Sequence, residues 1–215
     1  MTEPESARLI AGARQLGSTL SPENAAKLLR LLDDLAHWNR THNLTAITRR
    51  EDMITRHLLD SLSVHAELFG QTVADVGTGG GFPGLPLAVV NPERQFTLID
   101  SNHKKVRFVA HAVRELGLTN VTTMHVRVEA LQPEVPFDTV IARAFAPLPE
   151  MLEKIDLLCG PRTRVLAMKG KRPDDEISHL PEGWRLARTS ALEVPGLPEA
   201  RCLLVLERKR AAGLH

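Results

Sequence analysis

A glycine-rich stretch at residues 74–84, ADVGTGGGFPG, overlaps the end of a short apolar run. Five of its eleven residues are glycine, which lacks a Cβ and so permits tight turns and close approach of a ligand to the backbone. The apolar run TVADV predicts a buried strand, and ligands of α/β proteins bind beyond the carboxyl ends of such strands. The stretch therefore predicts a ligand-binding loop between a strand and a helix.

An acidic residue in the next predicted strand indicates that this ligand is a nucleoside. Asp100 lies 23 positions after Gly77 and ends the strand QFTLID, where its carboxylate can accept hydrogen bonds from ribose hydroxyls. NAD and S-adenosylmethionine both contain a ribose, but Phe82 stands where a dinucleotide fingerprint has glycine or alanine, and Pro83 offers no N–H to a pyrophosphate. Glu129, after the third strand region, is a second acid within reach of an adenine ring. The pattern favours S-adenosylmethionine.

The first 70 residues are predicted to be helical. Ser21 and Pro22 form an N-cap followed by proline at the first helical position, and apolar residues then recur at helical spacing up to Trp38. A second helical pattern runs through Met53, Ile54, Leu58, Leu62 and Phe69. We therefore expect residues 1–70 to form a helical segment that packs on the rest of the chain.

From residue 71 onward, strand and helix patterns alternate. This alternation predicts an α/β fold in which a mostly parallel sheet carries helices on both faces, over residues 71–215. The predicted strands after the first two are 120–126, 137–143, 163–170 and 202–208. A loop and helix are predicted over 81–91, and further helices over 104–117 and 148–160.

The composition indicates a single globular, cytoplasmic protein. The chain has 215 residues, 43% hydrophobic content and a net charge of +1, and it has neither a membrane-spanning apolar run nor a signal peptide pattern. Cys159 and Cys202 match no zinc or redox spacing, so we expect buried thiols and no metal site.

Several motifs, which follow one another in the family's order, resemble the RsmG family, also called glucose-inhibited division protein B. Members of this family are the 7-methylguanosine methyltransferases of small-subunit ribosomal RNA. The motifs are WNRTHNLTAIT, RHLLDSL, DVGTGGGFPGLPLA, FTLIDSNHKKVRF, RVE, FDTVIARAFAPL, MKG and LLVLER, between about residues 28 and 208. The resemblance implies a Rossmann-like class I methyltransferase fold, S-adenosylmethionine as the methyl donor, and N7 of one guanine in 16S ribosomal RNA as the acceptor.

The same resemblance implies a set of cofactor-binding residues. The family pattern places the cofactor against Gly77, Gly79, Phe82, Val128, Glu129 and Arg143, and Asp100 then holds the ribose. Gly80 departs from some relatives, which have proline there; the departure leaves the predicted site unchanged.

The chemistry implied by the resemblance needs no general base. Guanine N7 carries an in-plane lone pair and no proton, so catalysis should rest on alignment of the methyl group with the nucleophile. The chain lacks the Asn/Asp-Pro-Pro-aromatic motif of amino-group methylation after its fourth strand, and neither cysteine is placed to act as a nucleophile. We therefore name no certain catalytic residue and expect Arg143, Phe145 and Lys169 to position the acceptor, Phe145 by stacking and Lys169 at a phosphate.

Two further groups of residues carry expectations. His57 and Asp60 are three positions apart on one helix face, and we interpret them as structural, with Trp38 in the core. We expect six cations at the cofactor edge of the sheet, where they would form a rim that guides RNA. They are Lys104, Lys105, Arg143, Lys169, Lys171 and Arg172.

Two other functions stay open at this point. One is a non-catalytic RNA-binding module on a methyltransferase fold, which would fail to bind S-adenosylmethionine. The other is a methyltransferase for a protein or small molecule, which would show no salt-sensitive RNA binding. We expect a monomer whose partner is 16S ribosomal RNA or the small ribosomal subunit, with no membrane.

Overall fold

The N-terminal part of the chain is helical, as predicted. The computed structural model describes residues 4–209, so residues 1–3 and 210–215 lie outside it. Ser21 caps the longest helix, because its Oγ accepts a hydrogen bond from the Asn24 N–H at 3.1 Å. The elements here are α1 (Glu5–Gln15), α2 (Pro22–His42), α3 (Arg50–Met53), the π-helix η1 (Ile54–Leu59), α4 (Asp60–Leu62) and the 3-10 helix η2 (His65–Glu67).

The second predicted helical pattern is wrong at its C-terminal end. Helical structure stops at Glu67, and Phe69 is 40% exposed instead of completing the apolar face. The Arg164 guanidinium lies 5.2 Å from the centre of the Phe69 ring and covers it from the sheet side. A tertiary contact has therefore overridden the helical spacing at this residue.

A seven-stranded sheet forms the centre of the molecule, in the order β3-β2-β1-β4-β5-β7-β6. β1 to β5 pair in parallel, while β7 runs antiparallel between β5 and β6. The sheet is thus mostly parallel, as predicted. The strands are β1 (Thr72–Val76), β2 (Gln95–Asp100), β3 (Val121–His125), β4 (Phe137–Arg143), β5 (Cys159–Lys169), β6 (Trp184–Ala191) and β7 (Cys202–Arg208).

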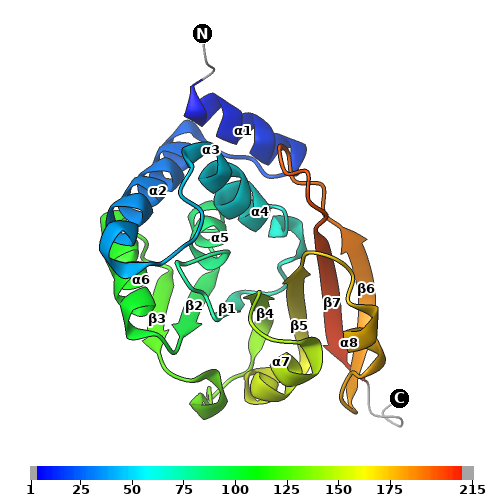
Figure 1. Ribbon diagram of the computed structural model, residues 1–215. Coiled ribbons are helices and arrows are strands. Elements are labelled where there is room, and N and C mark those ends of the chain that lie inside the picture. The colour runs from blue at the N-terminus through cyan, green and yellow to red at the C-terminus, as the bar shows by residue number, and fades with distance from the viewer. Residues whose placement is uncertain (1–3, 210–215) are drawn as a thin grey trace.

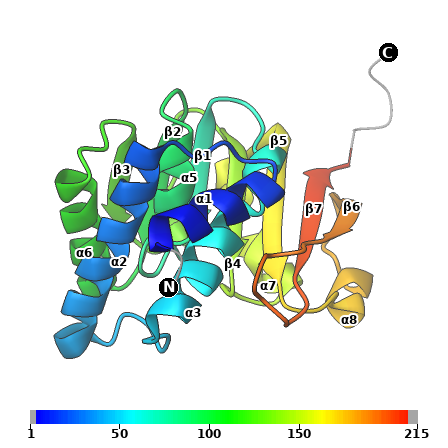
Figure 2. The ribbon, with the colours of Figure 1, turned by 90° about the horizontal axis from the view of Figure 1, so that it is seen from above.

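Helices cover both faces of the sheet (Figures 1 and 2). Val73 of β1 belongs to a core cluster with α1, α2, α5 and α6, whereas its neighbour Ala74 belongs to a cluster with α7 on the other face. This split follows the alternation of side chains along a strand. The helical segment and one face of the sheet therefore share one core. The helices after β1 are α5 (Gly84–Val90), α6 (His103–Glu115), η3 (Val128–Ala130), α7 (Leu148–Lys154), η4 (Asp156–Leu158) and α8 (Asp174–Ser178).

The edge strand β6 is an element that the sequence does not predict. Its alternation between buried and exposed residues lasts only from Trp184 to Leu186, because the pairing register shifts between Leu186 and Arg188. The exposed Arg185 and Arg188 are typical of edge strands, which in this way avoid pairing with other chains. Within residues 4–209, no helix has the length and apolar character needed to cross a membrane.

Candidate active site

The glycine-rich loop turns sharply at the carboxyl end of β1. The N–H groups of Gly77 and Thr78 both donate to the carbonyl of Ile99, at 2.9 and 3.0 Å. Gly77 has a φ of +68°, and a Cβ added there would lie 2.5 Å from Cδ2 of Phe145. Both its backbone conformation and its neighbour therefore require glycine.

Asp75 holds the base of this loop from inside the core. It is fully buried, and its Oδ2 accepts hydrogen bonds from the Thr78 hydroxyl at 2.6 Å and from the Gly84 N–H at 2.8 Å. Burial raises the pKa of Asp75 to about 6, although these hydrogen bonds pull it down. The side chain thus ties the loop to the start of α5, a role that the sequence does not predict.

Asp100 lies beside the loop at the end of β2. Its Oδ2 accepts from the Gly79 N–H at 3.0 Å and its Oδ1 from the Asn102 N–H at 2.8 Å, with Lys105 Nζ 3.9 Å away. Each carboxylate oxygen has two lone pairs, so each keeps one for a further donor. Asp100 can therefore hold the loop and still accept from ribose hydroxyls.

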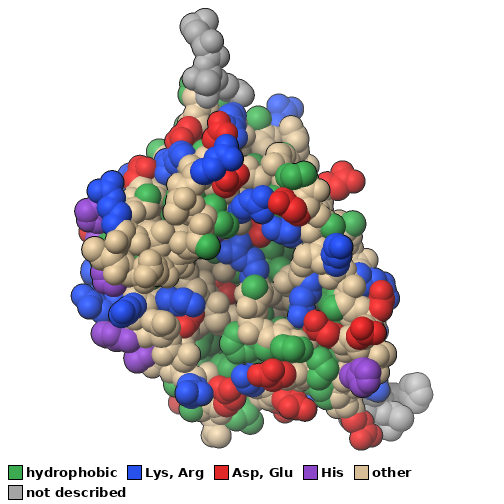
Figure 3. All heavy atoms as spheres, in the orientation of Figure 1, with side chains coloured by type: hydrophobic (Ala, Val, Ile, Leu, Met, Phe, Trp, Pro, Cys, Tyr) green, Lys and Arg blue, Asp and Glu red, His purple; other side chains and the backbone are tan. Residues whose placement is uncertain are grey.

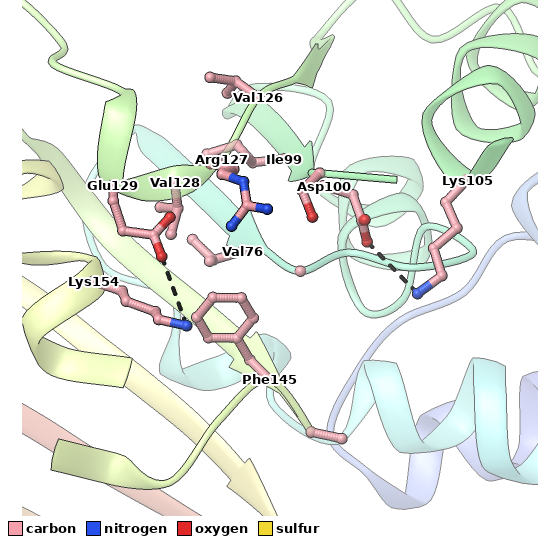
Figure 4. A pocket seen from close by; sticks show the side chains of 13 residues that line it. Val76, Ile99, Asp100, Lys105, Val126, Arg127, Val128, Glu129, Phe145 and Lys154 are labelled. Atoms are coloured by element: carbon pink, nitrogen blue, oxygen red, sulfur yellow. Dashed lines mark ion pairs between the residues drawn. The ribbon is translucent and has the colours of Figure 1, made fainter. Parts of the chain in front are cut away.

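A pocket of about 260 Å³ opens in front of these residues, and we call it the glycine-loop pocket (Figure 4). Apolar side chains from three strand ends form one wall. Glu129 faces Lys154 across the opening at 3.6 Å, and Lys154 Nζ also lies 5.7 Å from the centre of the Phe145 ring. The lining residues are Val76, Gly77, Ile99, Asp100, Ser101, Lys105, Val126, Arg127, Val128, Glu129, Ala144, Phe145 and Lys154.

The pocket contains some of the predicted cofactor residues and leaves out others. Its lining includes Gly77, Asp100, Val128 and Glu129, and Gly79 adjoins it through its hydrogen bond to Asp100. The other two lie elsewhere. Phe82 is 4% exposed and its ring stacks on that of His57 with centroids 4.5 Å apart, while Arg143 lines a different pocket.

That second pocket, of about 390 Å³, we call the arginine pocket. Asp60 lies at its centre with a side chain only 4% exposed, and it binds Arg143 at 3.0 Å and Arg201 at 3.1 Å through different oxygens. Arg143 also donates to the Arg56 carbonyl at 2.9 Å. The lining residues are Ile47, Arg56, His57, Asp60, Arg143, Ala144, Met168, Lys169, Gly170, Leu192 and Arg201.

Ala144 lines both pockets and separates them. Its φ of +50° is a left-handed conformation that non-glycine residues seldom adopt. At this turn Arg143 lines the arginine pocket and Phe145 lines the glycine-loop pocket. Phe145, which we expected on the acceptor side, thus lines the same pocket as Gly77 and Asp100 because of the backbone turn.

His57 occupies a buried position between the arginine pocket and the core. Its Nε2 lies 3.1 Å from the Thr45 hydroxyl, and its Nδ1 has no hydrogen-bond partner among the described residues. Burial, together with the nearby Arg143 charge, lowers the pKa of His57 to about 3. The imidazole is therefore neutral at physiological pH, which agrees with a structural role.

Replacing His57 with glutamine is expected to reduce the protein's sensitivity to acid. The pKa of His57 falls from 6.5 to about 3 on folding, so the stability it contributes is complete above pH 6.5 and is lost progressively toward pH 3. At pH 5 the loss is roughly 2 kcal/mol. Urea unfolding of wild type and of His57→Gln at pH 7.5 and pH 5 measures this loss of stability.

The pKa of Asp75 is raised, so its contribution changes in the opposite direction, with stability rising as the pH falls from 6 to 3.8. Asp75 is present in both wild type and His57→Gln, so its contribution cancels when their unfolding free energies are compared. An unfolding free energy that falls equally in wild type and His57→Gln between the two pH values would contradict the assignment.

Most of the cations expected at the RNA-guiding rim have acidic partners. Arg143 binds Asp60, Lys169 Nζ lies 2.8 Å from Glu176, and Arg172 Nε lies 2.6 Å from Asp174. In the described part of the chain, Lys104 and Lys171 form no such pair. A phosphate at Lys169 would therefore have to compete with Glu176.

Several lining residues were not predicted as part of the site. Arg127 immediately precedes the Val128-Glu129 pair, which is the only sequence signal for it. Lys154 comes from α7, and Arg56 and Arg201 come from segments before β1 and after β6. Nothing local in the sequence brings these three to the site, because their partners are distant along the chain.

The cysteines and possible metal ligands add no chemistry to the site. Cys159 and Cys202 are buried free thiols, as predicted, and burial raises the pKa of Cys159 to about 12. Over residues 4–209, the His, Cys, Asp and Glu side chains form no group of three able to hold a metal ion. The absence of a bound metal stays a prediction.

Comparison with solved structures supports the fold. The magnesium protoporphyrin IX methyltransferase of Synechocystis PCC 6803, solved with bound S-adenosylmethionine, superposes with a TM-score of 0.57 at 19% identity, over 88% of this chain and 98% of that one. TrmN from Thermus thermophilus superposes with a TM-score of 0.55 at 22% identity, over 73% of this chain and 53% of that one. The fold is that of class I methyltransferases, as predicted.

Comparison with protein sequences gives the family. The family model described as rRNA small subunit methyltransferase G matches residues 24–205. Ribosomal RNA small subunit methyltransferase G of Pseudomonas paraeruginosa is 46% identical over 210 residues, covering 97% of this chain and 98% of its own. The protein of the same name from Pseudomonas syringae pv. syringae is 46% identical over 209 residues, with the same coverage. With two adjoining pockets at the carboxyl edge of a methyltransferase sheet, this chain belongs to the rRNA small subunit methyltransferase G family.

Proposed function

We propose that this protein transfers a methyl group from S-adenosylmethionine to N7 of a guanine in 16S ribosomal RNA. Family membership supports the substrate class, and one structural observation supports the reaction most directly. The glycine-loop pocket and the arginine pocket adjoin at Ala144, so a donor in one and an acceptor base in the other would meet there.

The glycine-loop pocket has the properties needed to hold the cofactor. The Phe145 ring lies 2.5 Å from where a Cβ of Gly77 would be, so loop and ring pack closely as two parts of the pocket wall, whereas a Cβ at Gly79 would have nothing closer than 3.9 Å and leaves the backbone open to a ligand. Asp100 keeps free lone pairs for a ribose, and Ile99, Val126 and Val128 offer apolar surface to an adenine ring. When bound, S-adenosylmethionine supplies an electrophilic methyl group on a positively charged sulfur.

The arginine pocket offers no side chain prepared to remove a proton. Asp60 is bound by two guanidinium groups, Lys169 is paired with Glu176, and the pKa of His57 is about 3. Such a lining suits N7, which has no proton to lose, better than the exocyclic amino group of guanine. Catalysis would then depend on how well the pocket aligns the base with the methyl group.

The substrate also bears on where the protein acts and with which partners. Ribosomal RNA is made in the cytoplasm of bacteria, so we place the reaction there, with 16S ribosomal RNA or the small subunit as partner. We also propose that the protein acts as a monomer, and that it acts without a metal because N7 methylation needs no Lewis acid.

The direct test is methylation of ribosomal RNA by the purified protein. Small-subunit RNA from cells lacking the gene is incubated with methyl-labelled S-adenosylmethionine, digested and analysed for 7-methylguanosine. We expect label in 7-methylguanosine at one site. Binding of S-adenosylmethionine without transfer to RNA would favour a different acceptor, and no binding would favour the non-catalytic module.

Enlarging Ala144 is expected to slow methyl transfer. A leucine at this position would project into the space between the pockets and separate donor from acceptor, lowering kcat by about tenfold. The control is Ala144→Gly, which removes only one methyl group and suits the φ of +50°. Equal kcat values for the two variants would show that the reactants do not meet at Ala144.

A further inference from the structure

The exposed face of α6 carries cations and histidines from His103 to Arg114, and its exposed acid, Glu115, is the last residue of the helix. His103, Lys104, Arg107, His111 and Arg114 fall within an arc of about 100° around the helix. Val106, Phe108, Val109 and Ala112 are buried on the opposite side. We call those first five residues the α6 face.

The cations of the α6 face differ from those at the other end of the sheet. In the described structure Lys104, Arg107 and Arg114 have no carboxylate within the 4.0 Å of an ion pair. Near β5 and β6 the reverse holds, because Arg172, Arg185 and Arg208 are paired with Asp174, Glu207 and Asp156. α8 adds a further exposed acid, Asp175. Among the described residues, the α6 side thus presents three neighbouring cations without acidic partners, whereas Lys171 on the β5–α8 side stands beside the paired Arg172.

Aromatic side chains extend the α6 face at both of its ends. His103 packs on His125 of β3 with ring centroids 5.3 Å apart, next to the exposed Arg127. At the other end His111 packs on Trp38 of α2 at 5.2 Å. Figure 3 shows Lys, Arg and His side chains gathered along the left edge of the molecule, over α6 and the adjoining parts of α2 and β3.

The α6 face also leads to the active site. α6 begins directly after β2, and Lys105 in its first turn lines the glycine-loop pocket. From His103 to Arg114 the helix extends about 16 Å away from that pocket. A polyanion lying on this face would thus reach the pocket entrance at one end.

We infer that RNA flanking the target guanine docks along the α6 face, and that the β5–α8 side contributes little. The inference rests on the proposed function and adds the direction from which the substrate arrives. Phosphates are attracted by cations that have no internal partner, whereas paired cations must first give up a carboxylate. The exposed imidazoles of His103 and His125 offer flat surfaces that suit unpaired bases of an RNA loop, whereas Trp38 is half-buried against the core.

The test compares two double variants with the same loss of charge. Arg107→Gln with Arg114→Gln alters the α6 face without touching either pocket, and Lys171→Gln with Arg172→Gln alters the β5–α8 side. Binding to unmethylated small-subunit RNA is measured at several salt concentrations. For the α6 pair we expect affinity about tenfold lower and a log–log salt slope shallower by about 1.4. The other pair should change affinity by less than about twofold.

Cofactor binding without RNA separates this inference from the proposed function. Both double variants should bind S-adenosylmethionine as wild type does, which also shows that they are folded. If wild type methylates the RNA but the two pairs lose equal affinity, or the Lys171 pair loses more, the docking direction is wrong and the function stands. If wild type neither binds nor methylates the RNA, both are wrong.

Discussion

Replacing Gly77 with alanine is expected to weaken S-adenosylmethionine binding by two orders of magnitude or more. The added Cβ would lie 2.5 Å from Cδ2 of Phe145, at a φ of +68° that already disfavours a side chain. Phe145 would have to move, and it is itself part of the pocket wall. Titration calorimetry with the folded variant measures the loss.

Two comparisons isolate the contact with Phe145. Gly79 has nearly the same φ as Gly77, +61°, but a Cβ added there would have nothing closer than 3.9 Å. Gly79→Ala should therefore weaken S-adenosylmethionine binding by about tenfold at most. In a Phe145→Ala background, the penalty of Gly77→Ala should shrink to that of Gly79→Ala. If Gly77→Ala and Gly79→Ala weaken binding equally in the wild-type background, then backbone strain is responsible and the Phe145 contact is not.

Replacing Asp60 with alanine is expected to destabilise the fold by about 2–3 kcal/mol. The change leaves Arg143 and Arg201 without their shared carboxylate, and removal of one partner from a buried ion pair typically costs about 3–5 kcal/mol. We expect less because both arginine side chains are 22% exposed and can recruit water. The midpoint of urea unfolding gives the value.

The asparagine variant is the control for Asp60. Asp60→Asn keeps the shape and one oxygen acceptor while removing the charge, so its loss of stability should be smaller. Both variants should also bind RNA more weakly, because Arg143 would no longer be held in the arginine pocket. An unfolding midpoint for Asp60→Ala equal to that of wild type would mean that the ion pairs do not stabilise the fold.

Much of the sheet and the glycine loop could be predicted from the sequence because they depend on local signals. Buried parallel strands such as β1 and β2 are short apolar runs between turn residues. Gly77 is required by its own φ, and Asp100 follows from its position at a strand end. These features need only a few neighbouring residues to be recognised.

The rest of the site depends on contacts between distant residues. The left-handed turn at Ala144 decides which pocket Phe145 lines, and an alanine in the sequence does not indicate such a conformation. Whether a cation such as Lys169 is available to RNA depends on Glu176, whose position follows from the packing of α8. In the edge strand β6 the apolar alternation covers only Trp184 to Leu186 before the register shift, which is too short to mark a strand.

The ion pairs around Asp60 also set an order for the assembly of the site during synthesis. Asp60 lies 83 positions before Arg143 and 141 before Arg201. The last residue of the glycine-loop pocket in chain order is Lys154, whereas the arginine pocket needs Arg201, close to the C-terminus. On the ribosome, the last residue of the glycine-loop pocket is thus made before Arg201, the last residue that the arginine pocket needs. A chain that ends with β6 would lack Arg201, so Asp60 would keep only Arg143 as an ion-pair partner and the arginine pocket would be incomplete.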